Sequence, residues 1–375
     1  MIKVLNIISD SNIGGAGRCL INYIKYSDRE NFDISVLVPE GSLLKGEIES
    51  AGGRVIEADI APDKSWDIAS VKELKRIIKL ENPDIVHTHG ALSGRIAAKL
   101  CGKKIVYTRH SVFPVNPRIK KGVGRALNKA VNEYLSNDII AVAEAAKENL
   151  TDAGVDSKKV RVILNGVEKA LRSDSEECAR IKEEYGIEEN DFVIGILARI
   201  EEIKGHMDLL NAVKTLSLEG RKIKLLIIGR GSFEDKVKAG AKEMGLGDTV
   251  VFTGFIADVK PILSILDIQV NASFGTEATS LALLEGMSMG IPAVVSNYGG
   301  NPGVITHGEN GYIFNLRDSA DMAKYIALLM DSPETLNYMR KRAAEIFEEK
   351  FTADIYARNI ERVYKGLVTP KGDNQ

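Results

Sequence analysis

Two glutamates in a glycine-rich stretch are the residues of this sequence that most clearly suggest chemistry. Glu277 and Glu285 stand eight residues apart within 271–314, and the apolar residues around them predict a helix with Glu277 at its start and Glu285 in its middle. A turn from a strand into a helix favours anions, because the helix N-terminus presents free N–H groups and a partial positive charge. A carboxylate among leucines is costly to bury unless a polar group meets it, so the pair predicts a ligand site.

The spacing of these carboxylates argues against a glycosidase. Eight helical residues rise about 12 Å, whereas the two carboxylates of a glycosidase flank one bond at about 5–9.5 Å. We therefore expect Glu277 and Glu285 to hold different parts of one ligand.

A second candidate group is cationic and lies on a loop. A predicted strand ends near Ala198, and Arg199 and Lys204 follow it before a helix. Ligands of α/β sheets bind outside the carboxyl ends of strands. An arginine fork and a lysine point charge can converge on a diphosphate. We expect these two residues to bind a phosphorylated group, and the alternative is a pair of ordinary surface charges.

Two glycine turns also lie between a predicted strand and a helix. One contains Gly229 and Gly231, and the other contains Gly14, Gly15 and Gly17. Glycine lets the backbone approach a ligand closely, and a following helix favours an anion. The first-strand turn departs from the G-x-G-x-x-G spacing of dinucleotide-binding folds, which argues against an NAD enzyme. The alternative for both turns is a tight connection without a ligand.

The histidines are few, with His87 and His89 closing one predicted strand and His110 the next. His-x-His can bind a metal ion, but no third ligand is evident, so a structural role is expected for His87. His206 is expected at the surface.

The elements that must position these residues alternate along the chain. Short apolar runs separated by helical patterns indicate parallel strands covered on both faces. Two such series predict two doubly wound α/β domains. We predict a first domain at 1–168, a polar and turn-rich linker at 169–189, a second domain at 190–353 and a C-terminal helix at about 354–375.

Composition indicates an ordinary soluble intracellular protein rather than a secreted or membrane-spanning one. The 375 residues carry a net charge of −2, and the three cysteines are scattered without metal-ligand spacing. Free thiols in a reducing cytosol are expected. The N-terminus predicts a strand rather than a signal peptide, and no apolar run is long enough to span a bilayer. We expect a cytoplasmic protein.

One segment departs from this neutral balance. Residues 85–132 contain ten basic residues and no acidic one, and apolar residues are mixed with them in 111–135. This combination is typical of surfaces that rest on anionic lipid headgroups. We expect the basic segment 95–129 to contact the inner face of a membrane, and the alternative is a solvated helix face. Nucleic acid is not an expected partner, because no stacking aromatic array accompanies the charge.

The stretch 271–314 resembles the donor-binding signature of the GT4 glycosyltransferases, a retaining family of the GT-B fold. The family pattern is matched here by Glu277, Glu285, Gly286-Met287, Gly290-Ile291-Pro292 and Gly299-Gly300. The resemblance spans nearly the whole chain. It departs at Ala278-Thr279-Ser280, where most members have Gly-Phe-Gly, at Pro302-Gly303, where a Pro-Glu pair is usual, and at Ala143, where a serine is common.

The resemblance implies two Rossmann-like domains that face each other across a cleft, with the acceptor on the first and the donor on the second. The C-terminal helix is implied to pack back on the first domain. The implied catalytic residues are Glu277, Arg199, Lys204 and His110. The implied donor-binding residues are Gly14, Gly15, Gly229, Gly231, the backbone at Phe255 and Ile256, the N–H groups of Thr279, Ser280 and Leu281, and Glu285.

In the family, the second glutamate bonds the ribose, the first contacts the sugar ring, and the Arg and Lys bind the pyrophosphate. We therefore predict a retaining transferase that moves a hexose-type sugar from a nucleotide sugar to a lipid-linked or cell-surface glycan. The expected donor is a UDP-sugar, and no metal or other cofactor is expected. The alternatives are a sugar-nucleotide epimerase of the same fold and a non-catalytic donor-binding subunit.

Overall fold

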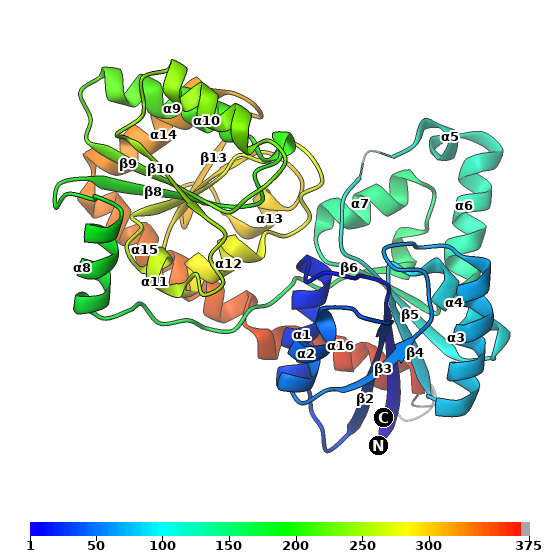
Figure 1. Cartoon of the computed structure of the whole chain (residues 1–375). Helices are drawn as coiled ribbons and strands as arrows, with labels where there is room; N and C mark the ends of the chain where they lie inside the picture. Colours follow the sequence, from blue (N-terminus) through cyan, green and yellow to red (C-terminus); the bar gives the residue numbers. More distant parts are fainter. Residues whose placement is uncertain (114, 369–375) are drawn as a thin grey trace, which may run out of the picture. The chain divides into compact units, whose positions relative to one another are not determined.

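The computed structural model describes residues 1–113 and 115–368, and it divides the chain into two compact units (Figure 1). Unit 1 comprises Met1–Val167 and the segment from Thr352 onward, and unit 2 comprises Glu168–Phe351. Each unit contains one sheet whose strands are all parallel. The prediction of two doubly wound α/β domains is confirmed.

Unit 1 contains a seven-stranded sheet in the order β3-β2-β1-β4-β5-β6-β7. The strands are β1 (Ile2–Ile8), β2 (Phe32–Pro39), β3 (Arg54–Ala58), β4 (Ile85–His89), β5 (Lys104–Arg109), β6 (Asp138–Ala141) and β7 (Val160–Val162). The helices are α1 (Gly15–Tyr26), α2 (Leu44–Ser50), α3 (Ile68–Glu81), α4 (Leu92–Leu100), α5 (Pro117–Lys120), α6 (Gly122–Tyr134), α7 (Glu144–Asp152), η1 (Ser157–Lys159) and α16 (Ala353–Val368). The strand order reverses between β1 and β4, which is where such sheets open a ligand crevice.

Unit 2 contains a six-stranded sheet in the order β10-β9-β8-β11-β12-β13. The strands are β8 (Phe192–Leu197), β9 (Ile223–Ile228), β10 (Val250–Gly254), β11 (Ile268–Asn271), β12 (Ala293–Ser296) and β13 (Gly311–Phe314). The helices are α8 (Ser175–Glu184), η2 (Glu202–Lys204), α9 (His206–Leu218), α10 (Glu234–Glu243), α11 (Lys260–Ser264), α12 (Leu281–Ser288), α13 (Asn301–Val304), α14 (Ser319–Asp331) and α15 (Pro333–Lys350). Here the order reverses between β8 and β11.

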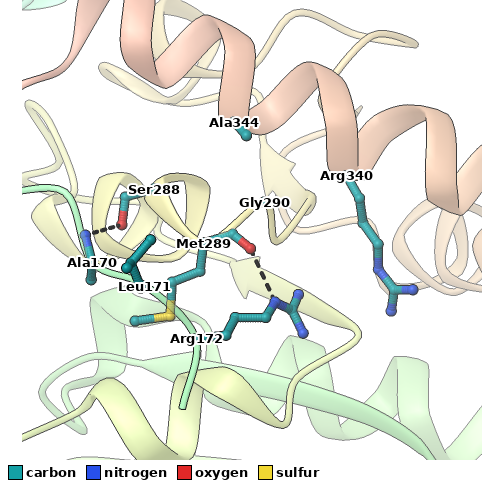
Figure 2. A pocket seen from close by; sticks show the side chains of 8 residues that line it. All are labelled: Ala170, Leu171, Arg172, Ser288, Met289, Gly290, Arg340 and Ala344. Atoms are coloured by element: carbon teal, nitrogen blue, oxygen red, sulfur yellow. Dashed lines mark hydrogen bonds between the residues drawn. The ribbon is translucent and has the colours of Figure 1, made fainter. Parts of the chain in front are cut away.

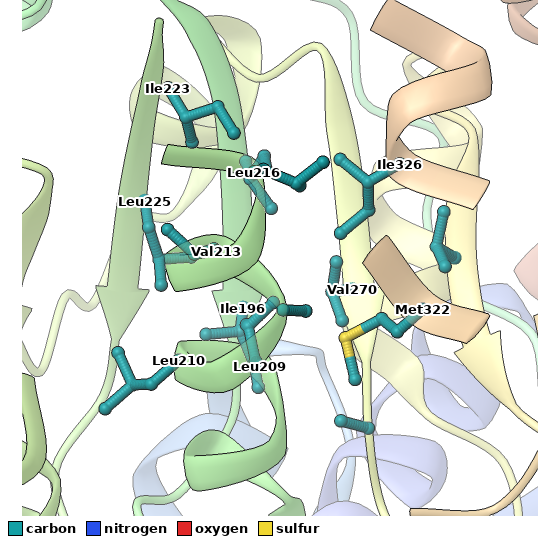
Figure 3. Packing of buried hydrophobic residues seen from close by; sticks show 14 of the residues in the cluster. Ile196, Leu209, Leu210, Val213, Leu216, Ile223, Leu225, Val270, Met322 and Ile326 are labelled. Atoms are coloured by element: carbon teal, nitrogen blue, oxygen red, sulfur yellow. The ribbon is translucent and has the colours of Figure 1, made fainter. Parts of the chain in front are cut away.

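The core of unit 2 consists of hydrophobic clusters on both faces of its sheet. Leu209 of α9 and Ile326 of α14 pack on one face of the sheet (Figure 3) and are fully buried. Leu225 of β9 faces this cluster, whereas Leu226 faces a second cluster that includes α8 and α11. Successive residues of a strand therefore pack into different hydrophobic clusters, one on each face of the sheet. This is expected for a parallel sheet that helices cover on both faces. Burying each such aliphatic side chain stabilises the fold by about 1.5–3 kcal/mol.

Two segments near the domain boundaries are helical. Residues 169–189, which the sequence predicts to be a linker, contain α8, whose Ile181 is buried in the second core cluster of unit 2. Helix α16 belongs to unit 1, where its Tyr356 and Tyr364 are buried. The end of the predicted C-terminal helix, 369–375, lies outside the described residues.

The first residues of unit 2 are anchored by Arg172 (Figure 2). Its Nε donates to the carbonyl oxygen of Met289 at 3.0 Å, and its Nη1 donates to that of Ser264 at 3.1 Å. These carbonyls end α12 and α11, so the guanidinium caps two helix C-termini. Arg172, Met289 and Arg340 line a pocket of about 440 Å³. The pocket lies where α12 leads into β12, at the amino ends of the strands.

None of the helices in 1–113 and 115–368 is both long enough and apolar enough to cross a lipid bilayer.

Candidate active site

The centre of the candidate site in unit 2 is the carboxylate of Glu277. Glu277 lies on the loop between β11 and α12 and is 6% exposed. Its Oε2 accepts hydrogen bonds from Lys204 Nζ at 2.8 Å and from Ser273 Oγ at 2.9 Å. The amide of Asn271 lies 3.5 Å from the same oxygen. Burying a carboxylate is costly without a counterion and hydrogen bonds, and this arrangement supplies both.

A left-handed glycine brings Lys204 to this carboxylate. Gly205 follows η2 with φ +74°, and a Cβ there would lie 2.2 Å from the carbonyl oxygen of Ala272. Only glycine therefore lets the start of α9 lie against the loop after β11. The N–H of Phe274 donates to the carbonyl of Ile203 at 2.9 Å, which joins the two loops directly. Lys204 and Glu277, far apart in sequence, are thus brought together at the carboxyl ends of β8 and β11.

The helix that follows Glu277 begins later than the sequence predicts. Helix α12 starts at Leu281, and the N-cap is Ser280, whose Oγ accepts a hydrogen bond from the N–H of Leu283. The prediction that Glu277 begins this helix is therefore wrong, and the helical rise does not describe its distance from Glu285. Thr276 has φ +52°, which keeps the preceding loop out of helical conformation. Glu285 lies in the second turn of α12 and is half-buried.

The N-terminus of α12 presents the N–H groups that the family resemblance assigns to donor binding. Thr279 and Ser280 precede the helix and Leu281 is its first residue, and all three are partly exposed. The N–H groups of a first helical turn have no partner within the helix and carry partial positive charge. This N-terminus lies a few residues beyond Glu277 in the chain.

The backbone that carries Arg199 is held by the predicted Gly-x-Gly turn. A Cβ on Gly229 would lie 2.1 Å from the carbonyl oxygen of Ala198, and one on Gly231 would lie 2.2 Å from that of Ile200. Both glycines therefore permit the loop after β9 to lie directly on the loop after β8. The side chain of Arg199 is exposed.

The segment at Phe255 and Ile256, which the resemblance assigns to donor binding, follows β10. Phe255 is 69% exposed, whereas Ile256 is partly buried against the second core cluster. The backbone there lies at the carboxyl end of the strand, as do the loops with Arg199 and Gly229.

The prediction for His206 is wrong, because this residue is 1% exposed rather than at the surface. It is the first residue of α9, directly after the left-handed Gly205. Burial, with a smaller contribution from the charge of Lys204, lowers the pKa of His206 to about 4. The sequence around His206 does not indicate burial, because this residue directly follows the polar pair Lys204-Gly205.

The predicted glycine turn of unit 1 leads into α1. Gly14 is the N-cap, Gly15 is the first helical residue, and both are exposed. A Cβ on Gly14 would lie 3.9 Å from Oδ2 of Asp10. Burial, and then the charge of Asp63, raise the pKa of Asp10 above its usual value. A carboxylate beside the turn favours hydroxyl donors over phosphate oxygens, because both carboxylate and phosphate are acceptors.

His110 is the end of a row of three histidines in unit 1. The ring centroids of His87 and His89 lie 4.4 Å apart, and those of His89 and His110 lie 5.1 Å apart. The rings of His89 and His110 share a hydrogen bond of 2.9 Å between Nδ1 and Nε2. His87 is bonded to Tyr364 of α16 and to Thr108 of β5, which fits a structural role.

Some supporting residues of the site were not predicted from the sequence. Ser273 and Asn271 hold Glu277 but have no distinctive spacing. Asn6 contacts His89. It could have been identified from the sequence, because it is a polar residue inside the apolar strand β1.

Residues 1–113 and 115–368 contain no group of three or more His, Cys, Asp or Glu side chains placed to hold a metal ion.

Comparison with known proteins reveals matches over both units. The family model described as "Glycosyl transferases group 1" matches residues 177–346, and the model described as "Glycosyltransferase Family 4" matches residues 13–171. A similar protein from Escherichia coli is the UDP-Gal:alpha-D-GlcNAc-diphosphoundecaprenol alpha-1,3-galactosyltransferase, 26% identical over 99% of this chain and 98% of that protein. The capsular polysaccharide biosynthesis glycosyltransferase CapM from Staphylococcus aureus is 23% identical over 91% of this chain and 92% of that protein.

A similar solved structure is HepE of Anabaena in complex with UDP. It superimposes with a TM-score of 0.83 at 19% identity, over 98% of this chain and 100% of that chain. The likeness shows that the two chains share one fold.

Proposed function

Because this chain belongs to the GT4 glycosyltransferases, which have the GT-B fold and use nucleotide sugars, we propose that it moves a hexose-type sugar from a UDP-sugar with retention of configuration. The proposed acceptor is a lipid-linked or cell-surface glycan of a polysaccharide pathway. The epimerase and the non-catalytic subunit are not favoured, because both matching family models describe glycosyltransferases.

The observation that carries the proposal is the buried pair of Lys204 and Glu277 at the carboxyl ends of β8 and β11. Lys204 Nζ donates a hydrogen bond to Glu277 at 2.8 Å, and the Lys204 side chain remains 16% exposed. It is thus suited to hold a carboxylate and, with Arg199, to meet a diphosphate. As the sugar leaves the nucleotide, negative charge develops on the diphosphate, and preplaced cations stabilise it without reorganisation.

The remaining proposed roles are those that the resemblance to the family implies. Glu277 would accept hydrogen bonds from the sugar ring, and Glu285 on α12 would accept them from the ribose. The N-terminus of α12 would receive a phosphate. Transfer without a metal is proposed because Arg199 and Lys204 supply the positive charge that a divalent ion would otherwise bring.

The choice of UDP and of a lipid-linked acceptor is supported by the similar proteins. HepE binds UDP in its crystal structure, and the E. coli protein is named for a UDP-galactose donor and a diphosphoundecaprenol-linked acceptor. Because this chain resembles HepE in fold and the E. coli protein in sequence, UDP is the first nucleotide to test.

Contact with an anionic membrane surface is supported by helix α6. Its Val123, Leu127 and Tyr134 are 85%, 63% and 67% exposed and recur at helical spacing. Exposed Arg118, Lys120 and Lys121 precede them. An apolar helix face beside basic residues matches the chemistry of an anionic lipid surface.

The basic segment is smaller than the sequence predicts. Arg95 is 6% exposed, stacks over the ring of Tyr107 at 4.1 Å and donates to Asn132 at 2.9 Å. Arg95 therefore belongs to the core beneath α6 and is excluded from the proposed membrane surface.

Thermal stabilisation by nucleotides tests the proposed donor. UDP, GDP, ADP and CMP are added in the presence of a chelator to the whole chain, to Glu285→Ala and to Glu189→Ala, an exposed control on unit 2. A ligand that binds only the folded protein raises its Tm in proportion to its concentration relative to Kd. We expect a shift with UDP that persists in Glu189→Ala and is lost in Glu285→Ala.

Incubation with UDP-sugars and a lipid-linked acceptor then tests the reaction itself. An α-linked product from an α-linked donor, seen by NMR of the anomeric proton, is the expected result. A β-linked product would contradict retention, and a stabilising nucleotide other than UDP would contradict the proposed donor.

A further inference from the structure

Asn6, His89 and His110 form one hydrogen-bonded row at the point where the strand order of unit 1 reverses. Asn6 lies on β1 and His89 ends β4, and these two strands are neighbours in the sheet. His89 Nε2 lies 3.2 Å from Asn6 Oδ1, and His89 Nδ1 lies 2.9 Å from His110 Nε2. The row therefore begins inside the sheet and ends just after β5, at the carboxyl edge of the sheet, where sheets of this kind bind ligands.

Each ring in this row is neutral near pH 7. Burial lowers the pKa of His110 to about 4. Burial, with His87 and His110 contributing, lowers the pKa of His89 well below its usual value. A neutral imidazole carries one N–H and one lone pair, so each ring is present as one of two tautomers.

The contacts select one tautomer for each ring. Oδ1 of Asn6 can only accept, so Nε2 of His89 carries the proton. The Nδ1 of His89 is then a lone pair, and it accepts from Nε2–H of His110. His110 is consequently left with an unprotonated Nδ1. That atom is buried and has no hydrogen-bond partner within the described part of the chain.

The third histidine does not influence this selection. His87 faces the hydroxyls of Tyr364 and Thr108 at 2.6 and 2.7 Å, and a hydroxyl either donates or accepts. His87 can therefore take either tautomer. Asn6 turns its Oδ1 toward His89, while its Nδ2 is buried without a partner in the described part of the chain, and in this orientation Oδ1 sets the direction of the hydrogen bonds.

We propose that Asn6 and His89 are positioning residues that hold His110 in the tautomer whose Nδ1 accepts a hydrogen bond from a sugar hydroxyl. This selects a ligand group that donates and rejects one that only accepts, such as a phosphate oxygen. The inference rests on the proposed function, because the ligand is taken to be the sugar substrate. The carboxyl of Asp10 beside Gly14 presents another acceptor in the same unit.

The tautomer is measured directly by NMR of the whole chain labelled with 15N in histidine. The chain has five histidines, and single His→Gln variants assign their signals. We expect a pyridine-type Nδ1 and a pyrrole-type Nε2 for His110 at pH 7. Asn6→Asp should retain this pattern because a carboxylate also accepts. Asn6→Ser should weaken it, because a hydroxyl can donate as well.

The functional part is tested with the same variants and a UDP-sugar. We expect Asn6→Ser to lower kcat/KM by about tenfold and Asn6→Asp to restore part of the loss. His307→Gln is the control, since His307 is exposed and lies in unit 2. UDP binding alone should be unchanged in Asn6→Ser, because the UDP contacts proposed lie in unit 2.

The outcomes separate this inference from the proposed function. A protonated Nδ1 on wild-type His110, or a pattern unchanged in Asn6→Ser, overturns the tautomer assignment whether or not the protein turns over a UDP-sugar. The expected tautomers with a normal kcat/KM in Asn6→Ser overturn the recognition of a hydroxyl. If Asn6→Ser does not fold, the 15N spectra of the wild type and of Asn6→Asp still show which nitrogen of His110 carries the proton.

Discussion

At the scale of single residues, the central feature of the candidate site in unit 2 is the buried ion pair of Lys204 and Glu277. Their side chains are only 16% and 9% exposed, so water screens the pair less than a surface ion pair. Ser273 shares the same carboxylate oxygen. Removing one partner leaves a buried charge without its counterion, which destabilises a protein more than removing both.

This pairing predicts strong energetic coupling. We expect Lys204→Met to lower the free energy of unfolding by about 3–5 kcal/mol and Lys204→Met with Glu277→Gln to lower it less. Urea denaturation of the two single variants and the double variant measures the coupling. Lys260→Met, at an exposed lysine of the same unit, is the control. Additive effects of the two substitutions would show that the pair does not stabilise the fold.

The buried His206 predicts a pH dependence. Its pKa is about 4 in the folded protein, below the usual value of 6.5. The unfolded chain therefore binds more protons between these values, so stability is lost as pH falls from 6.5 toward 4. Going from pH 7 to 5 should cost on the order of 2 kcal/mol through this residue.

Urea denaturation of the wild type and of His206→Gln at both pH values checks this. The variant has no titrating ring there, so its stability should fall by less on acidification than that of the wild type. An equal fall in both proteins would contradict a lowered pKa for His206.

Some residues of the site could be predicted from sequence and others could not. The types and order of Glu277, Arg199 and Lys204 predict a ligand site, and the structure brings Lys204 and Glu277 into contact. Their contacts depend on Gly205, whose left-handed backbone joins two loops that are distant in the chain. Such an approach is a property of packed loops and leaves no periodic signal.

At the scale of elements, strands and helices were predictable because their apolar periodicity is strong, whereas helix ends were not. Helix α12 was expected to begin at Glu277 because Ala278 and the leucines extend the apolar pattern. Its beginning is fixed instead by Ser280, a residue type that commonly caps helices. Local hydrogen bonding thus overrides hydrophobic pattern at helix ends.

Arg172 predicts a loss of stability at the start of unit 2. Arg172→Leu removes charge-assisted hydrogen bonds to the last carbonyls of α11 and α12. We expect the free energy of unfolding to fall by about 1.5–3 kcal/mol, with a smaller fall for Arg172→Lys. Chemical denaturation followed by circular dichroism measures the change. Arg180→Leu, at an exposed arginine of α8, is the control, and equal effects would contradict the capping role.

Helix α6 predicts membrane binding that depends on both apolar and basic side chains. Leu127→Ser and the pair Lys120→Gln with Lys121→Gln should each weaken binding to vesicles that contain anionic lipid. Each lysine near such a surface contributes about 1 kcal/mol, so the pair should lower affinity by roughly 10–30-fold. Sedimentation with vesicles measures the bound fraction.

The matched control for this measurement is Lys72→Gln with Lys79→Gln, which removes two exposed lysines from α3 of the same unit. Binding that is equally weak in the control would indicate a general charge effect. Binding that is unchanged in all variants would exclude α6 as the membrane surface.

At the scale of the whole molecule, unit 1 is built from two separated pieces of the chain. Residues up to Val167 and those from Thr352 meet through a bridge between Val167 and Thr352, and the N–H of Ala353 donates to the carbonyl of Val167 at 2.9 Å. In unit 1, Tyr364 of α16 packs on Tyr23 and Phe32. The predicted domain order was accessible from the sequence, but this meeting of distant segments carries no local pattern.

Truncation after Phe351 should therefore affect the units unequally. The shortened chain lacks α16, so Tyr23 and Phe32 lose a buried partner and the thermal transition of unit 1 should be lost. Unit 2 comprises Glu168–Phe351 and remains intact, so stabilisation by UDP should persist. Differential scanning calorimetry with and without UDP measures both. A single transition of unchanged height would show that α16 does not complete unit 1.

The return of the chain to unit 1 also sets an order of events during synthesis. A ribosome delivers α16 only after all of unit 2 has emerged, although β1–β7 emerge first. Domains usually complete folding in the order of synthesis. Here, the part of the first sheet that α16 covers stays exposed until unit 2 has been synthesised. Nascent chains of this protein would therefore need protection of the α16 surface for the time that unit 2 takes to be made.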